Sequence, residues 1–468
     1  MFRRQLLALL LAFGLFASAC GGDDAGSDAA DVDDGASSTT EAADADESDA
    51  VDDDDAGDEA TTTEPVELTA SWSGVTEDTI RLGFTTSDLE ELKSLGLVDL
   101  DRGDPNLMLD TLIADVNARG GIHGRMLEAH LELVVPLDAT QGDAACVRLT
   151  EDIGVFAVLA PFTGPNTDLN PCFNSRNSTI VVGGQPTPEQ LEISNAPWIS
   201  NTMFSDRRLA GVIQLMEDDG LLGDTVAVIV TGEEEPAARD IVIPALEDLG
   251  KNVVDVVFET NNGDILAGEA QFEVFGELFR TEGVDSVILV ENTATFGATQ
   301  LVRTGLDANF LVVDSAQLLG GIGALEGAVP EDLAGIIGSG LASEQEAWEL
   351  EATQDCVRVF EEANPEITIK PTSELAPGES NWYENILIFC APLRLFELAA
   401  NAAGPELTHE SFLAGAESLG DIDIPGQVFA SMGPDKYGAA DGLRLTVFDP
   451  TVGEKGGAVP YGPLEQIG

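Results

Sequence analysis

Residues 107 to 136 read LMLDTLIADVNARGGIHGRMLEAHLELVVP, and this stretch decides how the chain folds. Apolar side chains recur at helical spacing in its first half, at Leu109, Leu112, Ile113 and Val116. Gly120 and Gly121 then end the helix, and an alternating apolar run begins near Met126. The stretch therefore predicts a helix, a tight glycine turn and a strand.

The same alternation of short apolar runs and amphipathic stretches continues along the chain. The expected strands lie at 79–84, 155–160, 179–182, 226–230, 253–258, 286–290, 310–313 and 442–448. Late helices are expected at 344–363 and 383–402. Strands that alternate with helices in this way are typical of a parallel sheet, so the fold class is α/β.

Three motifs carry a resemblance to a known family: TEDTIRLGF, which starts at Thr76, VNARGGIHGR, which ends at Arg125, and VFAVLAPFTGP, which starts at Val155. From Thr76 to Ile467 the chain resembles the type I periplasmic solute-binding proteins. Within that group it is similar to the branched-chain amino acid (Leu/Ile/Val) receptor family of ABC importers. The resemblance implies two Rossmann-like lobes joined by a three-segment hinge that closes on a ligand.

The resemblance and the composition together predict how the chain is divided. We expect a signal peptide at 1–19 and an acidic, disordered, lipid-anchored tether at 20–70. The expected segments of the body are 71–201 and 339–425 for the first lobe, and 202–338 and 426–468 for the second lobe.

The composition limits the partners. The 468 residues exceed one ordinary domain, which favours two lobes, and the formal net charge is −64. Nucleic acids and anionic membrane surfaces bind proteins that carry positively charged patches. We therefore expect an acidic chain of this kind to make no nucleic-acid contact. The acidic surface is either an adaptation to salt or a means of keeping an exported protein soluble, and the sequence favours neither.

The first twenty residues form an export signal. Two arginines precede an apolar run at 6–16, which is too short to span a bilayer, and Ala17-Ser18-Ala19 precede Cys20. Lipoprotein signals usually carry Leu where this chain has Ala17. The Gly-Gly and long polar stretch after Cys20 nevertheless resemble bacterial lipoproteins. We therefore expect lipidated Cys20 to anchor the protein on the outer, periplasmic or cell-surface face of the membrane.

The tether has almost nothing to bury. Residues 21 to 64 contain 18 acidic side chains and no Lys or Arg, a composition typical of a disordered, extended segment. The acidic run at 52–55 lacks the glycine-punctuated loop and terminal Glu of a calcium site. We expect a solvated spacer.

Polar residues follow the expected first-lobe strands at their carboxyl ends, the edge where open α/β sheets bind ligands. Thr85 and Thr86 follow the first strand, and they either face a ligand or cap a turn. Thr163 and Gly164 follow the strand at 155–160. Because proline suits the first helical position, we expect Gly164 as the N-cap, with free backbone N–H groups aimed at a ligand carboxylate.

The family resemblance supports these positions and adds two. The corresponding family loop supplies hydroxyl and amide donors to the ligand carboxylate, and Thr163 and Gly164 match it by position. It also implies Gln185 and Thr187 as residues of a second ligand loop, although on sequence alone they form only a turn.

Four second-lobe residues lie at expected strand ends: Glu291, Asn292, Asp314 and Ser315. A carboxylate there would pair with a ligand ammonium or else cap a helix, and the family position favours Asp314. After the strand at 226–230 the family often has an aromatic residue, but this chain reads TGEEEP. That difference argues against an aliphatic amino acid clamp.

The five cysteines indicate an oxidising compartment. Cys20 accounts for the odd one, and the other four allow three connectivities. Local pairing, Cys146 with Cys172 and Cys356 with Cys390, is the simplest arrangement. A zinc site is the weaker alternative, because the spacings do not fit and the three histidines are scattered.

No G-x-S-x-G elbow, H-E-x-x-H helix or P-loop occurs in the sequence, so we expect no enzyme, no cofactor and no metal. We expect a monomeric binding protein that captures a small polar ligand, an amino acid or a related amide or carboxylate, for an ABC permease. A sensory receptor for the same kind of ligand and an exported α/β hydrolase are the alternatives.

Overall fold

The computed structural model describes residues 68–467 apart from 97, 99, 137, 233–234, 260–264, 291–292, 316–317, 320–329 and 453–455. The expected signal peptide, Cys20 and all but the last residues of the tether lie outside the described residues, as do Glu291 and Asn292.

The first lobe is built on a sheet of five parallel strands in the order β2-β1-β3-β4-β5. The strands are β1 (Thr79–Ser87), β2 (Met126–Val134), β3 (Ala157–Leu159), β4 (Ile180–Val182) and β5 (Trp198–Ile199). Each of the first four coincides with a strand that the sequence predicts. The parallel α/β fold class is therefore confirmed.

The stretch at 107–136 folds as its sequence predicts. Helix α3 (Pro105–Ala118) is capped by Asp104, whose carboxylate accepts the backbone N–H of Asn106, and the chain then turns into β2. Gly121 has a φ of 64°, and a Cβ on it would collide with the backbone oxygen of Arg125. Glycine is therefore required there.

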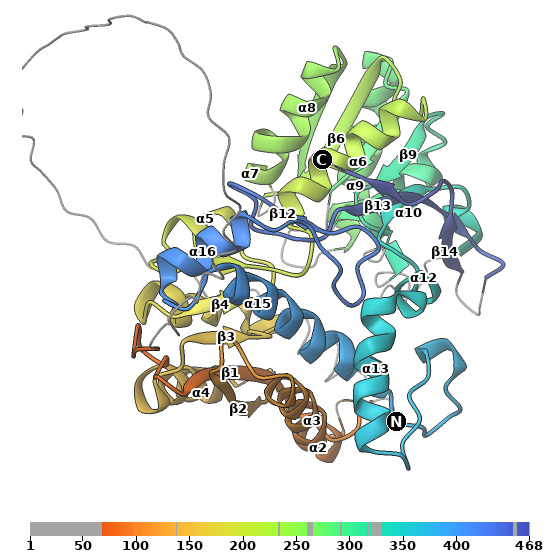
Figure 1. Ribbon diagram of the computed structural model, residues 1–468. Helices are drawn as coiled ribbons and strands as arrows, with labels where there is room; N and C mark the ends of the chain where they lie inside the picture. Colours follow the sequence, from red (N-terminus) through yellow and green to blue (C-terminus); the bar gives the residue numbers. More distant parts are fainter. Residues whose placement is uncertain are drawn as a thin grey trace, which may run out of the picture. The chain divides into compact units, whose positions relative to one another are not determined.

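Two layers of helices cover the first-lobe sheet. On one face, alternate residues of β1 such as Leu82 and Phe84 pack against α3, α13 (Glu351–Ala363) and α15 (Ala391–Ala402). On the other face, Val158 and Val181 pack against α4 (Ala139–Val147). Figure 1 shows α15, drawn in blue, next to the first-lobe strands, and α13, drawn in cyan, next to α3. Helices from the return segment thus complete the first-lobe core.

Shorter elements complete the first lobe and the crossings beside it. They are α2 (Leu89–Ser94), η2 (Arg148–Ile153), η3 (Gly164–Leu169), η4 (Cys172–Arg176), α5 (Pro188–Glu192), α12 (Glu344–Glu349), η9 (Thr372–Glu374), α14 (Trp382–Asn385), η10 (Ile386–Cys390), α16 (His409–Glu417), β11 (Gly420–Asp421) and β12 (Ser431–Met432).

One helical stretch in the described part of the chain, Trp382–Ala402, is long and apolar enough to cross a membrane by length and composition. Its most apolar window is 67% buried inside the fold, with Phe389 and Phe396 fully covered. Its apolar character is that of a core helix.

The second lobe is built on a sheet in the order β14-β13-β10-β9-β8-β6-β7, with β15 paired to β13. Its strands are β6 (Thr225–Thr231), β7 (Asn252–Phe258), β8 (Ser286–Leu289), β9 (Asn309–Val312), β10 (Ile337–Gly340), β13 (Gly442–Asp449), β14 (Gly457–Pro460) and β15 (Glu465–Gln466). Strands β6 to β10 pair in parallel, whereas β13 and β14 are antiparallel. Around them lie α6 (Ser205–Asp218), α7 (Glu235–Ala237), η5 (Ala238–Val242), α8 (Ile243–Asp248), α9 (Ile265–Glu282), α10 (Ala294–Thr304) and η8 (Pro330–Leu333).

The first and third crossings between the lobes are hydrogen-bonded to each other. The N–H of Ser200 donates to the oxygen of Tyr437 at 2.7 Å, and the N–H of Ala439 donates to the oxygen of Ser200 at 2.8 Å. Ala439 belongs to the first-lobe core, and Ala440 to the second-lobe core. The third crossing therefore falls between these residues, after the expected boundary at 425/426.

The second crossing follows β10. Residues Ile337–Gly340 belong to the second-lobe sheet, so the chain leaves this lobe after the expected boundary at 338/339. Arg444 on β13 then bonds Glu346 in α12 at 2.5 Å, and this hydrogen bond lowers the pKa of the Glu346 carboxyl to about 2. The ion pair ties α12 to the second-lobe sheet.

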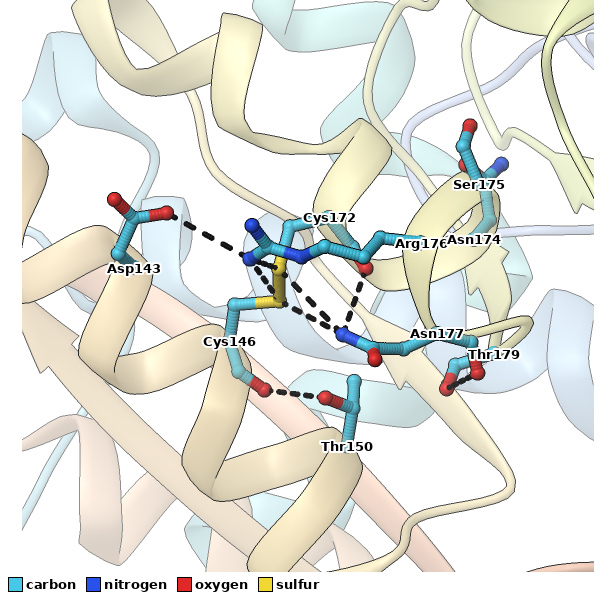
Figure 2. Close-up of a disulfide and its surroundings, with 9 residues drawn as sticks. All are labelled: Asp143, Cys146, Thr150, Cys172, Asn174, Ser175, Arg176, Asn177 and Thr179. Carbon is cyan, nitrogen blue, oxygen red and sulfur yellow. Dashed lines mark hydrogen bonds and ion pairs between the residues drawn. A yellow bond between two sulfur atoms is a disulfide. The ribbon is translucent and has the colours of Figure 1, made fainter.

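Both locally paired disulfides are present, with 6.4 Å between the Cα atoms in each. Cys356–Cys390 joins α13 to η10, and Cys146–Cys172 joins α4 to η4. Figure 2 shows the guanidinium of Arg176 beside the second pair, where it bonds Cys172 Sγ. The disulfide thus ties η4, the segment after η3, to α4.

Replacement of Arg125 with Ala is expected to destabilise the protein. Its fully buried guanidinium donates to the oxygens of Thr76, Pro405 and Thr69 at 2.7–2.9 Å, and these acceptors would be left unpaired. The expected loss is about 3 kcal/mol in the free energy of unfolding measured with urea. As control, Arg148→Ala removes a mostly exposed arginine that lies 3.5 Å from Glu132, and we expect a loss below about 1 kcal/mol. Equal losses in both variants would contradict this role of Arg125.

Stability is expected to fall as the pH drops from 6.5 towards 4. The ring of His409 lies 4.6 Å from that of Trp72, and burial lowers the pKa of His409 from 6.5 to about 4. Because the unfolded chain binds this proton more readily than the folded one, protonation favours unfolding within that window. Melting temperatures measured across it should decline more steeply for the wild type than for His409→Phe, which keeps the ring but does not titrate. Parallel curves for the two proteins would refute the assignment.

Candidate functional site

Thr85 and Thr86 lie at the carboxyl end of β1 but differ in exposure. Thr85 is buried, and its hydroxyl donates to the oxygen of Ala160 at 2.9 Å. Thr86 is half-buried. Ala160 has a φ of 51°, a left-handed conformation that is unusual for a residue with a Cβ. Thr85 therefore fixes a strained backbone at the start of the next loop, and Thr86 is the better placed of the two to reach a solute.

The loop after β3 is held by a buried asparagine. The Oδ1 of Asn170 accepts the N–H of Phe162, and its Nδ2 donates to the oxygen of the same residue, both at 2.9 Å. Thr163 follows with an exposed side chain. The predicted N-cap is wrong by one residue: Thr163 is the N-cap, and Gly164 is the first residue of η3. The extended conformation of Thr163, with a ψ of 165°, delays the helix to Gly164.

The loop after β4 is held by hydrogen bonds from residues at the first crossing. The indole N–H of Trp198 donates to the oxygen of Gly183 at 2.8 Å, and the hydroxyl of Ser200 donates to the oxygen of Gly184 at 2.6 Å. Gln185 follows with an exposed side chain. Thr187 is also exposed, and its hydroxyl caps α5 by accepting the N–H of Gln190 at 3.3 Å.

In the second lobe, Asp314 follows β9 and is engaged by an arginine. Nη1 of Arg208 donates to Asp314 Oδ2 at 2.5 Å, and each side chain is 19% exposed. Arg208 lies in the first turn of α6, which begins directly after the first crossing. The N-cap of that helix is Phe204, and Asp206 lies within its first turn.

The other polar residues at this edge are largely buried. Ser315 is 6% exposed, and its hydroxyl shares a hydrogen bond of 2.5 Å with that of Thr446. Thr293 donates to the oxygens of Ile229 and Val290 at 3.1 and 2.8 Å. The Arg208–Asp314 pair is therefore one of the charged groups at this edge, together with Arg444–Glu346 at the end of β10 and Glu259 after β7.

Three residues of this site were missed by the sequence analysis: Asn170, Ser200 and Arg208. Asn170 and Ser200 act on loops from other elements, which no local pattern reveals. Arg208 did leave a signal, because the pair Arg207-Arg208 stands out in a chain with only 21 basic residues.

A cavity of about 560 Å³ lies away from these strand ends. It is lined by the end of α5, the residues up to Trp198, the start of α16 and Tyr437, and none of the predicted ligand residues lines it.

The three histidines lie apart from the candidate site. His123 bonds the oxygen of Asn401 at 3.1 Å, His130 lies in β2, and His409 packs on Trp72. Among the described residues, no group of three or more His, Cys, Asp or Glu side chains is placed to hold a metal ion.

No protein-family model matches the chain, and no curated protein matches it. Solved structures do. An ABC transporter substrate-binding protein from Desulfitobacterium hafniense in complex with Leu is 12% identical, with a TM-score of 0.53, and the match covers 82% of this chain and 100% of that one. A leucine-, isoleucine-, valine-, threonine- and alanine-binding protein from Brucella ovis is 15% identical, with a TM-score of 0.51. That match covers 82% of this chain and 95% of that one.

A periplasmic binding protein type 1 from Bordetella pertussis is similar at 13% identity and a TM-score of 0.50, with coverage of 82% of this chain and 100% of that one. Identities this low establish the fold alone. The two-lobed fold of the type I periplasmic binding proteins, expected from the sequence, is confirmed.

Replacement of Asn170 with Ala is expected to loosen the loop at 161–163. The N–H and carbonyl of buried Phe162 would lose their partner, at a cost of about 2 kcal/mol in unfolding free energy. Amide hydrogen exchange of residues 161–166 should accelerate, while that of β6 should not. Asn106→Ala, at an exposed site, serves as the control. Unchanged exchange in this loop would show that Asn170 does not hold it.

Proposed function

We propose that this chain, which has the fold of the type I periplasmic binding proteins, is an extracytoplasmic receptor for a small polar solute. The solute is an amino acid or a related amide or carboxylate, bound at the carboxyl ends of the strands of both lobes. The receptor is exported, held to the membrane by lipidated Cys20, and delivers its ligand as a monomer to an ABC permease.

The observation that carries this proposal is the fixed loop after β3. Hydrogen bonds from Thr85 and Asn170 hold the backbone of this loop, whereas the side chain of Thr163 stays exposed. Because the backbone beside Thr163 is held in this way, little conformational entropy is lost when its hydroxyl donates to a carboxylate. The neighbouring loop after β4 is held similarly, by Trp198 and Ser200.

The crossings support a closing motion. Three segments connect the lobes, and the first and third are tied at Ser200 by two backbone hydrogen bonds. Such a connection favours rotation about one axis over free movement of the lobes. The proteins with this fold that are named above include one in complex with Leu and one in a closed conformation.

Thr163→Ala is expected to weaken solute binding without unfolding the protein. Scanning fluorimetry of the mature protein against amino acids, amides and small carboxylates should identify a class that raises the melting temperature. At a hundredfold excess over Kd the ligand adds about 2.7 kcal/mol of stability. Loss of a charge-assisted hydrogen bond from Thr163 should weaken that binding about tenfold or more in calorimetry.

The control is Thr140→Ala, which removes an exposed threonine in α4. It should leave both the affinity and the melting temperature unchanged. Absence of binding by any member of the three classes would refute the proposed ligand class. Reconstitution with the permease then separates import from sensing, because only an import receptor drives uptake of its ligand, whereas conversion of the solute would indicate a hydrolase.

A further inference from the structure

The side chain of Arg208 occupies the place where the sequence analysis expected a ligand ammonium. Its Nη1 donates to Asp314 Oδ2 at 2.5 Å, so the carboxylate already has a cationic partner within the chain. Nε of Arg208 donates to Ser339 Oγ at 3.3 Å, and Nη2 donates to Ser339 O at 3.4 Å. These bonds place the guanidinium over the carboxyl ends of β9 and β10.

The anchor of this guanidinium is rigid. Ser339 is fully buried in β10, and its hydroxyl donates to the oxygen of Val313, the residue before Asp314. The side chains of Arg208 and Asp314 are each 19% exposed, so the pair is mostly buried but can still be reached from solvent. An ion pair fixed at both ends in this way presents a constant charge pattern to an incoming solute.

A guanidinium carries five N–H donors, and Arg208 uses three of them in the described part of the chain. One N–H remains on each of the two terminal nitrogens. Two such donors match the two oxygens of a carboxylate, which accepts charge-assisted hydrogen bonds from arginine in a fork-like pair.

We infer that Arg208 selects the solute: the second-lobe half of the site binds an oxyanion, and the ligand is a carboxylic acid without an α-ammonium group. This inference rests on the proposed function and narrows its ligand class. An ammonium that approached Asp314 would meet the positive charge of Arg208, which disfavours amino acids by charge repulsion. A carboxylate at the same place gains the two remaining N–H donors.

The competing arrangement also occurs in this chain. Asp441 Oδ1 accepts from both Arg207 and Lys436 at 2.7 Å, so one carboxylate can serve two cations. An amino acid ammonium that shared Asp314 with Arg208 in this manner would overturn the inference. Experiment separates the two cases, because they assign opposite roles to Arg208 and Asp314.

The test compares matched pairs of solutes by calorimetry on the mature protein: leucine with 4-methylpentanoate, phenylalanine with 3-phenylpropanoate, and glutamate with glutarate. We expect one des-amino acid to bind at least about tenfold more tightly than its amino acid. Arg208→Gln should weaken that binding about 10- to 100-fold, the range for a hydrogen bond to a charged group. Arg208→Lys keeps the positive charge but cannot form the paired hydrogen bonds. Its affinity for the acid should therefore lie between those of the wild type and Arg208→Gln.

Two further variants make the result decisive. Asp314→Asn removes the carboxylate, keeps an oxygen acceptor for Arg208 and should retain binding of the acid. Arg358→Gln, at an exposed site on α13, is the matched charge control. Circular dichroism and melting curves establish that each variant is folded.

Tighter binding of the amino acid, lost in Asp314→Asn, would overturn the inference and leave the solute-receptor function standing. Binding of an acid that is unaffected by Arg208→Gln would also overturn it. If no member of any pair binds to the folded wild type, both the inference and the proposed ligand class fail.

Discussion

The buried carboxylate of Asp441 is the interaction on which the connection between the lobes depends. It is 1% exposed and accepts hydrogen bonds from Arg207 and Lys436 at 2.7 Å and from the hydroxyl of Ser431 at 2.6 Å. These donors come from α6, from the segment before the third crossing and from β12. Loss of both cations would leave the buried carboxylate uncompensated, and an uncompensated buried charge costs about 3–5 kcal/mol. The third crossing is therefore fixed in place, and the hydrogen bonds at Ser200 extend that fixation to the first.

Each lobe is completed by a segment from the far end of the chain, and this determines where rigidity is found. The first-lobe sheet comes from residues before 200, but α13 and α15 supply one whole layer of its core. The disulfide Cys356–Cys390 joins that layer internally, whereas Cys146–Cys172 fixes the opposite layer behind the loop at 161–163. The loops at the strand ends thus rest on a scaffold that is closed on both faces, so binding need not order them.

The two halves of the candidate site differ in charge. At the first-lobe edge the exposed candidate residues, such as Thr163 and Gln185, are neutral, and the loops that carry them are held by Asn170 and Trp198. At the second-lobe edge the Arg208–Asp314 pair places a guanidinium on a chain whose net charge is −64. A local cation in an acidic background defines where an anionic group can bind, because the surrounding carboxylates repel it elsewhere.

The sequence by itself determined the elements, their order and the turn at Gly121, because helical spacing, alternation and the demand for a positive φ are local properties of consecutive residues. It also favoured the disulfide pairs that form, since each joins cysteines that are close along the chain, whereas three connectivities were possible. Only the tertiary structure decided which candidate residues are exposed: Thr85 and Ser315 are buried by hydrogen bonds to distant residues, while Thr163 and Gln185 stay at the surface. It also decided that Asp314 pairs with Arg208, 106 residues away. Such pairings depend on the distance between groups after folding, and no pattern along the chain encodes that distance.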